Sequence, residues 1–477
     1  MDPALTPQNT REILHRLSGA NLRFAEAYPG DRADRQPVHT VYGGAHLFAA
    51  DVAARLGAAA LRSLEEYAPD PETLARAIGL PGCEAAGDGD GRGAPAAAGA
   101  RDKEGLARAV YARVIEKLKR EPVEDYRIDF EDGYGNRPDA EEDGHAAADA
   151  TELARGMRER TLPPFIGIRI KPLSEELRGR ALRTLDLFVG TLVAKTRGAL
   201  PGNFVITIPK ITSPEQVTTV VEACELIERA RKLAPGSLRL ELMVETTQSI
   251  FAPDGALALP RLVAAARGRC RGAHFGTYDY TAGVGITAMY QLPSHLACDF
   301  ARHVMQVSLA GTGVTMSDGA TTVMPVGPHR AARGEKLTAA QLEENRRAVH
   351  HAWRIHYQDV RSSLRNAYYQ GWDLNPGQLP TRYAAVFAFF LESRAEAGAR
   401  LKAFVDKAAQ ATLLGSTFDD AATGQGLLNF FLRGLSCGAL TEEEALATGL
   451  TLEELRGRSF VKMLNVRRAA AAKAGGG

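Results

Sequence analysis

Eight short apolar runs, each followed by a segment compatible with a helix, constrain the fold of this chain more than any other feature. Each run is six to eight residues long, the usual length of a β-strand. Strands that alternate with helices favour a parallel sheet, and this many units favour a closed (β/α)8 barrel, the α/β fold known as the TIM barrel, over an open sheet. The predicted strands span residues 38–43, 126–131, 165–170, 203–209, 238–245, 272–279, 313–318 and 369–375.

Helix signals lie between these runs and change in character late in the chain. Ser213 and Pro214 suit the N-cap and first turn of a helix that runs through Arg231. After about residue 380 only helical patterns remain, and they predict helices at 382–410, 424–434, 442–447 and 452–462.

The sequence therefore predicts two units. A TIM-barrel catalytic domain is expected over residues 1–380 and a helical C-terminal cap over residues 381–466. Residues 84–101 are rich in Gly, Ala and Asp and predict a flexible surface loop, while residues 467–477 predict a disordered tail.

Charge and composition exclude several classes of function. The formal net charge is only +1 and no basic tract is interleaved with aromatic residues, so no nucleic-acid partner is expected. The most apolar run, residues 383–391, is too short to span a bilayer, and residues 1–21 are too polar for a secretory signal. The five cysteines form no CxxC pair, which argues against a disulfide framework or a zinc site. A cytoplasmic protein without a membrane partner is expected.

Charged residues gather where the predicted strands end, which is the end of a TIM barrel that binds substrates. Alternation along the second strand places Arg127, Asp129 and Glu131 on one face, with Ile128 and Phe130 on the other. Later strands end in further charged residues: Arg169, Lys210, Glu245 and Asp279.

If those faces point inward, three to four carboxylates and two to three cations meet in one small opening at the carboxyl ends of the strands. This opening is called the mouth of the barrel. Burying so many charges is costly unless they pair or bind an ion. Oxygen donors without accompanying Cys or His suit Mg2+ or Mn2+ better than zinc. A keto acid could complete the metal shell, and the metal could stabilise an enolate formed when a carbon–carbon bond breaks or forms. Alternatively, the strand-end acids only pair with basic residues to hold loops.

A series of motifs in order resembles the HpcH/HpaI aldolase and citrate lyase beta-subunit family of the pyruvate/phosphoenolpyruvate TIM-barrel superfamily. Ile128-Asp-Phe-Glu-Asp132 is similar to the family's L-D-L-E-D, and Ile208-Pro-Lys-Ile-Thr-Ser213 to its L-P-K-V-x-S. Val244-Glu-Thr-Thr247 and Phe275-Gly-Thr-Tyr-Asp279 match its E-T and F-G-x-x-D motifs. The remaining matches are 40–44, 168–171 and 371–378, so the resemblance covers roughly the first four fifths of the chain.

The resemblance implies a Mg2+-dependent carbon–carbon lyase, aldolase or Claisen-type condensing enzyme that acts through the enolate of a 2-oxo acid or acyl-CoA. Glu245 and Asp279 would be the direct metal ligands, and Arg169 would bind a substrate carboxylate. The backbone N–H groups of Gly276, Thr277 and Tyr278 would also meet that carboxylate. Asp129, Glu131 and Asp132 would hold metal-bound waters or orient Arg169 and Lys210, so that the predicted catalytic residues are Asp129, Glu131, Arg169 and Lys210.

Departures from the family pattern leave the substrate open. Lys171 and Pro172 follow Arg169-Ile170 where the family carries Asn, and Asn375 replaces the usual His of the closing strand. No coenzyme A pocket can be assigned, so both an oxo acid and a CoA ester remain candidate small-molecule substrates. Relatives assemble through outer barrel helices, which implies a homo-oligomer.

Other residues offer weaker candidates. His46 could act as a base, Lys210 could form a Schiff base, and Asp373 could act as an acid or base. Packing, electrostatic binding and capping are the respective alternatives. His274 is expected to be structural. The sequences Gly283-Val-Gly285 and Gly311-Thr-Gly313 lack the spacing of nucleotide-binding loops.

Two further functions compete with the lyase. Phosphotransfer on phosphoenolpyruvate uses the same enolate, but the segment after residue 381 is short for a nucleotide-grasp or phospho-histidine unit, and no His follows His356. A catalytically silent ligand-binding barrel is the other alternative. The joint presence of Arg169, Glu245 and Asp279 argues against it.

Overall fold

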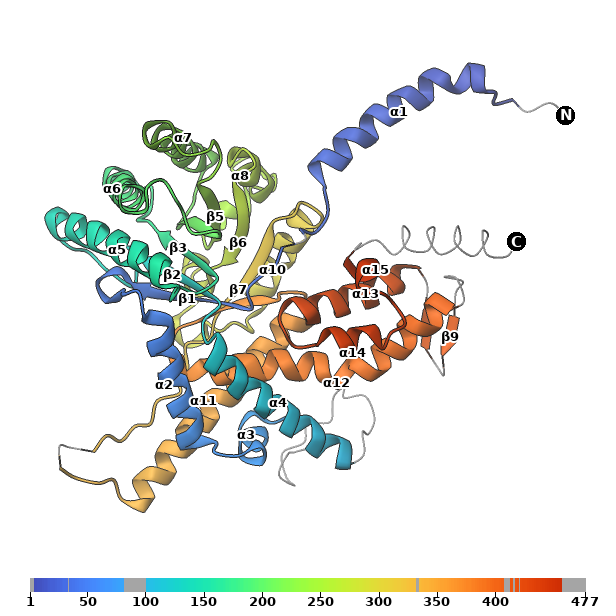
Figure 1. Ribbon diagram of the computed structural model, residues 1–477. Helices are drawn as coiled ribbons and strands as arrows, with labels where there is room; N and C mark the ends of the chain where they lie inside the picture. The colour runs from blue at the N-terminus through green and yellow to red at the C-terminus, as the bar shows by residue number, and fades with distance from the viewer. Residues whose placement is uncertain are drawn as a thin grey trace.

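The computed structural model contains a closed eight-stranded barrel (Figure 1) in the order β1 to β8. It describes residues 4–32, 34–80, 100–331, 334–406, 412–414, 417–419 and 421–456. Every neighbouring pair of barrel strands is parallel, including β8 with β1. The predicted TIM-barrel fold is therefore confirmed. The strands are β1 (His39–Gly44), β2 (Asp125–Asp129), β3 (Phe165–Arg169), β4 (Phe204–Ile208), β5 (Arg239–Val244), β6 (Cys270–Phe275), β7 (Thr315–Ala320) and β8 (Gln370–Asp373).

Each strand begins within two residues of its predicted start and, apart from β6, which ends four residues early at Phe275, ends within two residues of its predicted end. A helix follows each strand. The connection after β1 is the longest and carries three helices, α2, α3 and α4, of which α4 packs against α12. The helices of the barrel are α2 (Val52–Tyr67), α3 (Pro71–Ile78), α4 (Ala100–Arg120), α5 (Asp139–Glu159), α6 (Arg178–Thr196), α7 (Pro214–Arg231), α8 (Leu259–Ala265), α9 (Thr277–Gly283), α10 (Leu296–Leu309), α11 (Ala339–Arg365) and α12 (Leu379–Asp406).

The predicted start of α7 is confirmed in position but not in its capping bond. The helix spans Pro214–Arg231, with Ser213 at the N-cap and Pro214 in the first turn. The Ser213 side chain makes no capping hydrogen bond. Proline at this position is favourable without such a bond, because its fixed φ suits a helix and its missing N–H has no partner there.

The strands bury apolar residues on their outer face and polar residues on their inner face. Ile128, Ile168 and Ile206 are fully buried. Register pairs them across β2, β3 and β4, so they form one row against the outer helices. The alternating residues, such as Arg127 and Glu241, point into the barrel and pair with each other. The predicted alternation of β2 is therefore correct, and it sends charged side chains inward.

The C-terminal region is mainly helical, as predicted, with one exception. Its helices after α12 are α13 (Ala421–Ser436), α14 (Glu442–Leu446) and α15 (Leu452–Arg456). The prediction of helices alone was wrong between α12 and α13, where β9 (Thr412–Leu414) and β10 (Thr417–Asp419) form an antiparallel pair. At the other end of the chain, α1 (Pro7–Ala27) extends away from the barrel (Figure 1).

Three predicted segments fall partly or wholly outside the described residues. The predicted loop at 84–101 lies outside them up to residue 99, and its last two residues begin α4. The predicted tail at 467–477 and the end of the helix predicted at 452–462 also lie outside them. In the described part of the chain, no helix combines the length and apolarity needed to cross a membrane.

The buried acid Asp149 of α5 gives the first testable prediction. Its side chain is 3% exposed and its Oδ2 has no hydrogen-bond partner among the described residues. Burial, reinforced by the charge of Glu152, raises the pKa of Asp149 to about 8. The folded state thus keeps a proton that the unfolded state, with a pKa near 3.9, releases. Stability attributable to this group is present below pH ~4 and is lost as the pH rises towards 8.

Asp149→Asn is expected to raise the free energy of unfolding by up to about 4 kcal/mol at pH 7, because each pKa unit corresponds to about 1.4 kcal/mol. The gain should be smaller at pH 5, about 1.5 kcal/mol, because that pH is only about one unit above the unfolded pKa near 3.9, whereas pH 7 is about three units above it. Urea unfolding at the two pH values measures both quantities. Equal stability of the two proteins at both pH values would contradict the prediction.

Candidate active site

Arg169 and Asp129 form a buried pair at the carboxyl ends of β3 and β2. Arg169 donates from Nε and Nη2 to the two carboxylate oxygens of Asp129, at 2.7 and 2.6 Å. Asp129 also accepts the backbone N–H groups of Glu131 and Gly133. The remaining guanidinium nitrogen, Nη1, lies 3.1 Å from Glu131. Arg169 is therefore held rigidly, with Nη1 as the nitrogen nearest the other charged residues of the mouth.

Two aromatic residues that the sequence did not single out enclose the same guanidinium. Arg169 Cζ lies 4.8 Å from the ring centroid of Tyr42 and 5.5 Å from that of Trp372. The two rings contact each other, with centroids 4.3 Å apart. Tyr42 on β1 and Trp372 on β8 both occupy inward positions of their strands. Alternation along those two strands was the signal that could have found them.

Lys210 lies among the acids of the mouth. Its ammonium group pairs with Glu131 and lies 3.0 Å from Asp132 and 3.5 Å from Asp279. Burial acts to lower the pKa of Lys210, but the carboxylates of Glu131, Glu245 and Asp132 outweigh it and hold that pKa above its ordinary value. Lys210 is therefore protonated at neutral pH, which disfavours the alternative of a Schiff-base amine.

The backbone, not strand alternation, places Lys210 in the mouth. Alternation assigned it to the face of Ile206 and Ile208, and both isoleucines are buried on the outer side of the barrel. That part of the prediction was wrong, because β4 ends at Ile208 and Lys210 adopts a left-handed backbone with φ of 49°. This conformation turns the side chain towards Glu131 and aims its backbone N–H at Glu245, at 2.6 Å from Oε1.

Glu245 follows β5 and is only 2% exposed. Burial raises the pKa of its carboxyl to about 7, with the neighbouring Asp279 charge adding to the effect and Arg169 and Lys210 opposing it. Its Oε2 lies against Gly276, where an added Cβ would be 2.4 Å from that oxygen. A glycine at position 276 is thus required for Glu245 to adopt this position.

Asp279 lies on a helix, not at the end of a strand as predicted. The strand β6 ends at Phe275, and Asp279 belongs to the first turn of α9. Gly276 is the N-cap of that helix, and Thr277 is buried with no hydrogen-bond partner for its Oγ1 among the described residues. The Tyr278 hydroxyl donates to the carbonyl oxygen of Ala320 at 2.7 Å. Of these residues, Gly276 lies against Glu245, and the predicted role of Gly276, Thr277 and Tyr278 in binding a substrate carboxylate stays a prediction.

A second polar layer lies beneath the mouth, inside the barrel. Arg127 donates to Glu241 at 2.7 Å and pairs with Asp125, and all three are buried. His274 lies 3.5 Å from Glu241 and 3.0 Å from the Tyr42 hydroxyl. His274 therefore belongs to this buried layer inside the barrel, and its expected structural role stays a prediction.

The other predicted candidates lie apart from this cluster. Asp373 of β8 is fully buried behind the barrel wall, where it accepts hydrogen bonds from His39 and Arg382 and contacts His356. This position does not suit an acid or base in the mouth. His46 lies after β1 with its ring 5.8 Å from that of Tyr134.

The donor set of the mouth fits a hard divalent cation. Four carboxylates, Glu131, Asp132, Glu245 and Asp279, surround Lys210. Oε2 of Glu131 forms an ion pair with Nη1 of Arg169 but has no hydrogen-bond partner among the described residues. Oxygen ligands of this kind suit Mg2+ or Mn2+. No group of three or more His, Cys, Asp or Glu side chains in the described part of the chain could hold a metal by itself. A metal here would therefore need ligands from solvent or substrate.

The fold and the mouth together define a TIM-barrel protein with an acidic, cation-lined site at the carboxyl ends of its strands. The chain belongs to the family described as a domain of unknown function, DUF6986, whose model matches residues 17–463. No curated protein matches it significantly.

Solved structures share the barrel at low sequence identity. A citrate lyase from Burkholderia xenovorans LB400 is 18% identical with a TM-score of 0.50, over 71% of this chain and 92% of that chain. The protein CitE from Mycobacterium tuberculosis, in complex with magnesium, acetoacetate and coenzyme A, is 15% identical with a TM-score of 0.41, over 69% and 95%. A Haloferax volcanii malate synthase in a magnesium/glyoxylate complex is 16% identical with a TM-score of 0.40, over 74% and 76%. These similarities concern the fold.

Proposed function

We propose that this protein is a Mg2+-dependent carbon–carbon lyase or condensing enzyme that acts through the enolate of a 2-oxo acid or an acyl-CoA. The observation that carries the proposal is the convergence of Glu245 and Asp279 on Lys210, beside the rigid Arg169–Asp129 pair. This arrangement combines anionic metal ligands with fixed cations for an anionic substrate. The neighbour with a TM-score of 0.50 is named a citrate lyase, which is the same class of reaction.

Glu245 and Asp279 would hold the cation, which would stabilise negative charge on the enolate oxygen when bound. The protein residues would bind and orient the substrate. Arg169 would offer Nη1 to a substrate carboxylate, since its other two nitrogens are fixed by Asp129. Glu131 would connect Arg169 to Lys210 and keep both cations in place. Preorganised charges of this kind lower a barrier because they need little rearrangement during the reaction.

The backbone around Gly276, Thr277 and Tyr278 would form the wall against which the substrate carboxylate lies. Gly276 allows Glu245 to approach this backbone closely. The TIM-barrel catalytic domain at residues 1–380 and the helical cap at 381–466 remain predictions within this proposal, as does assembly into a homo-oligomer.

Exchange of solvent deuterium into the methyl group of pyruvate tests the proposal, because exchange requires formation of the enolate. The full chain with Mg2+ is expected to exchange at least about a thousandfold faster than the same protein with EDTA, as followed by proton NMR. A panel of oxo acids, hydroxy acids and CoA esters assayed for cleavage and condensation would then identify the substrate class. Tight binding of these compounds with neither exchange nor turnover would instead indicate a silent ligand-binding barrel.

A further inference from the structure

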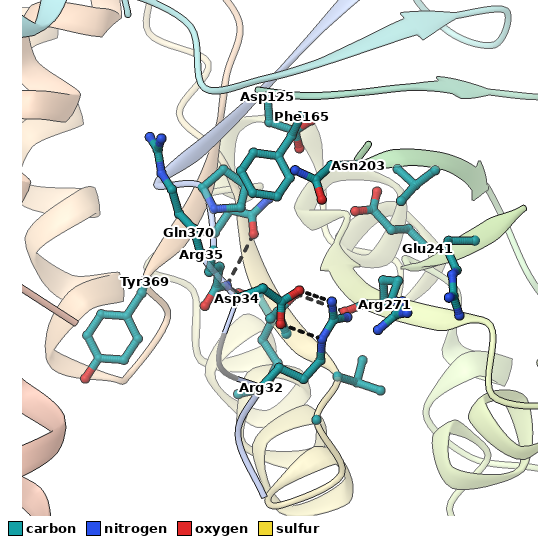
Figure 2. A pocket seen from close by; sticks show the side chains of 18 of the residues that line it. Arg32, Asp34, Arg35, Asp125, Phe165, Asn203, Glu241, Arg271, Tyr369 and Gln370 are labelled. Atoms are coloured by element: carbon teal, nitrogen blue, oxygen red, sulfur yellow. Dashed lines mark hydrogen bonds and ion pairs between the residues drawn. The ribbon is translucent and has the colours of Figure 1, made fainter. Parts of the chain in front are cut away.

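A large cavity lies at the end of the barrel opposite the mouth (Figure 2). Its volume is about 550 Å³, within the range of roughly 300–1,000 Å³ that small-molecule sites occupy. The first residues of six barrel strands line it, which places it beneath the amino ends of the sheet. These residues are Asp125, Phe165, Phe204, Arg239, Thr315 and Gln370.

The wall of this cavity carries more positive than negative charge. Six arginines and four acids line it, which leaves a formal excess of two positive charges. Four of the arginines have carboxylate partners. Arg127 pairs with Asp125 and Glu241, Arg32 with Asp34, and Arg433 with Asp31. The fourth, Arg35, pairs with Glu121 and Glu124.

The two remaining arginines of the lining are Arg239 and Arg271. Both are half-buried, and neither has a side-chain hydrogen bond or ion pair among the described residues. Burial, together with the nearby charges of Arg32 and Arg239, lowers the pKa of Arg271 from its ordinary value. The carboxylate of Asp34 opposes this shift, but Asp34 pairs with Arg32, so Arg271 keeps no carboxylate partner of its own among the described residues.

A β-bulge places Arg271 at the cavity. In the register between β5 and β6, Leu240 pairs with Cys270 and Glu241 pairs with Gly272, so Arg271 is the extra residue. Strict alternation from the inward His274 and Gly272 would have sent Arg271 to the outer face of the barrel. Bulges commonly redirect a side chain in this way next to functional sites.

We propose that this cavity binds a small molecule through an oxyanion, a phosphate or carboxylate group, held between Arg239 and Arg271. Guanidinium groups match the geometry of such oxyanions and form charge-assisted hydrogen bonds with them. The site is separate from the mouth, because the Arg127–Glu241 layer and the Tyr42–His274 pair lie between the two. It does not depend on the proposed lyase function.

Titration of the full-length protein with inorganic phosphate and with malonate, each against sodium chloride at equal ionic strength, tests the site. Calorimetry and thermal unfolding are expected to show saturable binding of at least one of the two anions. The anion that binds distinguishes a phosphate from a carboxylate ligand. The double variant Arg239→Gln/Arg271→Gln is expected to weaken binding at least tenfold, because the charge-assisted hydrogen bonds of both guanidinium groups to the anion are lost.

Two controls locate the binding. Arg229→Gln removes an exposed arginine of α7 outside the cavity and should bind like the wild type. Glu245→Gln alters only the mouth and should also leave this binding unchanged. If the double variant does not fold, the single variants Arg239→Gln and Arg271→Gln provide the same comparison. No saturable binding of either anion, or full binding by the arginine variants, would overturn the proposal.

Discussion

Glu245→Gln is expected to reduce Mg2+-dependent exchange of the pyruvate methyl protons by about a thousandfold or more. The substitution removes one of the two carboxylates proposed to hold the cation and keeps the shape of the side chain. A divalent cation contributes several kcal/mol to the stabilisation of a developing oxyanion, and a thousandfold corresponds to about 4 kcal/mol. The exchange rate across a Mg2+ titration, followed by NMR, measures the effect. Asp279→Asn should act in the same direction.

The fold should tolerate Glu245→Gln. Burial raises the pKa of Glu245 to about 7, so a neutral side chain is readily accommodated there, and the amide oxygen of Gln can still accept the backbone N–H of Lys210. The matched control is Asp254→Asn, an exposed carboxylate paired with Arg261 in the loop after β5. Asp254→Asn should exchange at the wild-type rate. If Glu245→Gln stays folded and retains wild-type exchange, the proposed metal site is wrong.

The barrel was predictable because inward and outward side chains alternate along strands such as β2 and β5. Ile128 and Phe130 lie against the outer helices and Asp129 faces inward, as the period of two requires. The same rule placed Glu245 on the inward face of β5, while Leu242 and Val244 lie fully buried on its outward face. The strand positions, and the end of the barrel at which charged residues gather, were therefore predictable from the sequence.

Residues beyond the strand ends were less predictable, because their positions depend on backbone turns and not on periodicity. Lys210 reaches the mouth through a left-handed residue conformation, and Asp279 through the first turn of a short helix. Arg271 lies in a bulge that only the pairing of two strands defines. The antiparallel pair β9–β10 likewise depends on contacts between strands of only three residues, too short to give a periodic signal.

The role of Asp373 depends on contacts between residues far apart in the sequence. His39 of β1, His356 of α11 and Arg382 of α12 all contact its carboxylate. The sequence could suggest a strand end near Asp373, but it could not show that two helices and another strand meet behind it. Asp373 therefore joins β8 to the outer helices. We expect its loss to lower the stability of the fold and to have little direct effect on catalysis in the mouth.

Asp373→Asn is expected to destabilise the protein by about 3–5 kcal/mol, the usual cost of leaving a buried charge without its partner. Arg382 is only 4% exposed and donates from both Nε and Nη2 to this carboxylate. The Asn side chain has the same size but carries no negative charge to compensate Arg382. Its NH2 group also replaces one accepting oxygen of the carboxylate with a donor, which then faces Arg382 or a histidine. Urea unfolding at pH 7 measures the loss. The control Asp186→Asn removes an exposed partner of Arg231 and should cost less than about 1 kcal/mol.

Measuring the free energy of unfolding as a function of pH distinguishes the contribution of the Asp373 charge from that of its hydrogen bonds. Burial opposes ionisation, but Arg382, His356 and His39 together hold the pKa of Asp373 well below its ordinary value. A carboxyl with a lowered folded pKa stabilises the protein above its unfolded pKa of about 3.9, and this contribution is lost as the pH falls towards the folded value. Below pH 4 the stability of the wild type should therefore approach that of Asp373→Asn. A difference between the two proteins that stays constant from pH 7 to pH 3 would show that the carboxylate charge is not what joins β8 to α11 and α12.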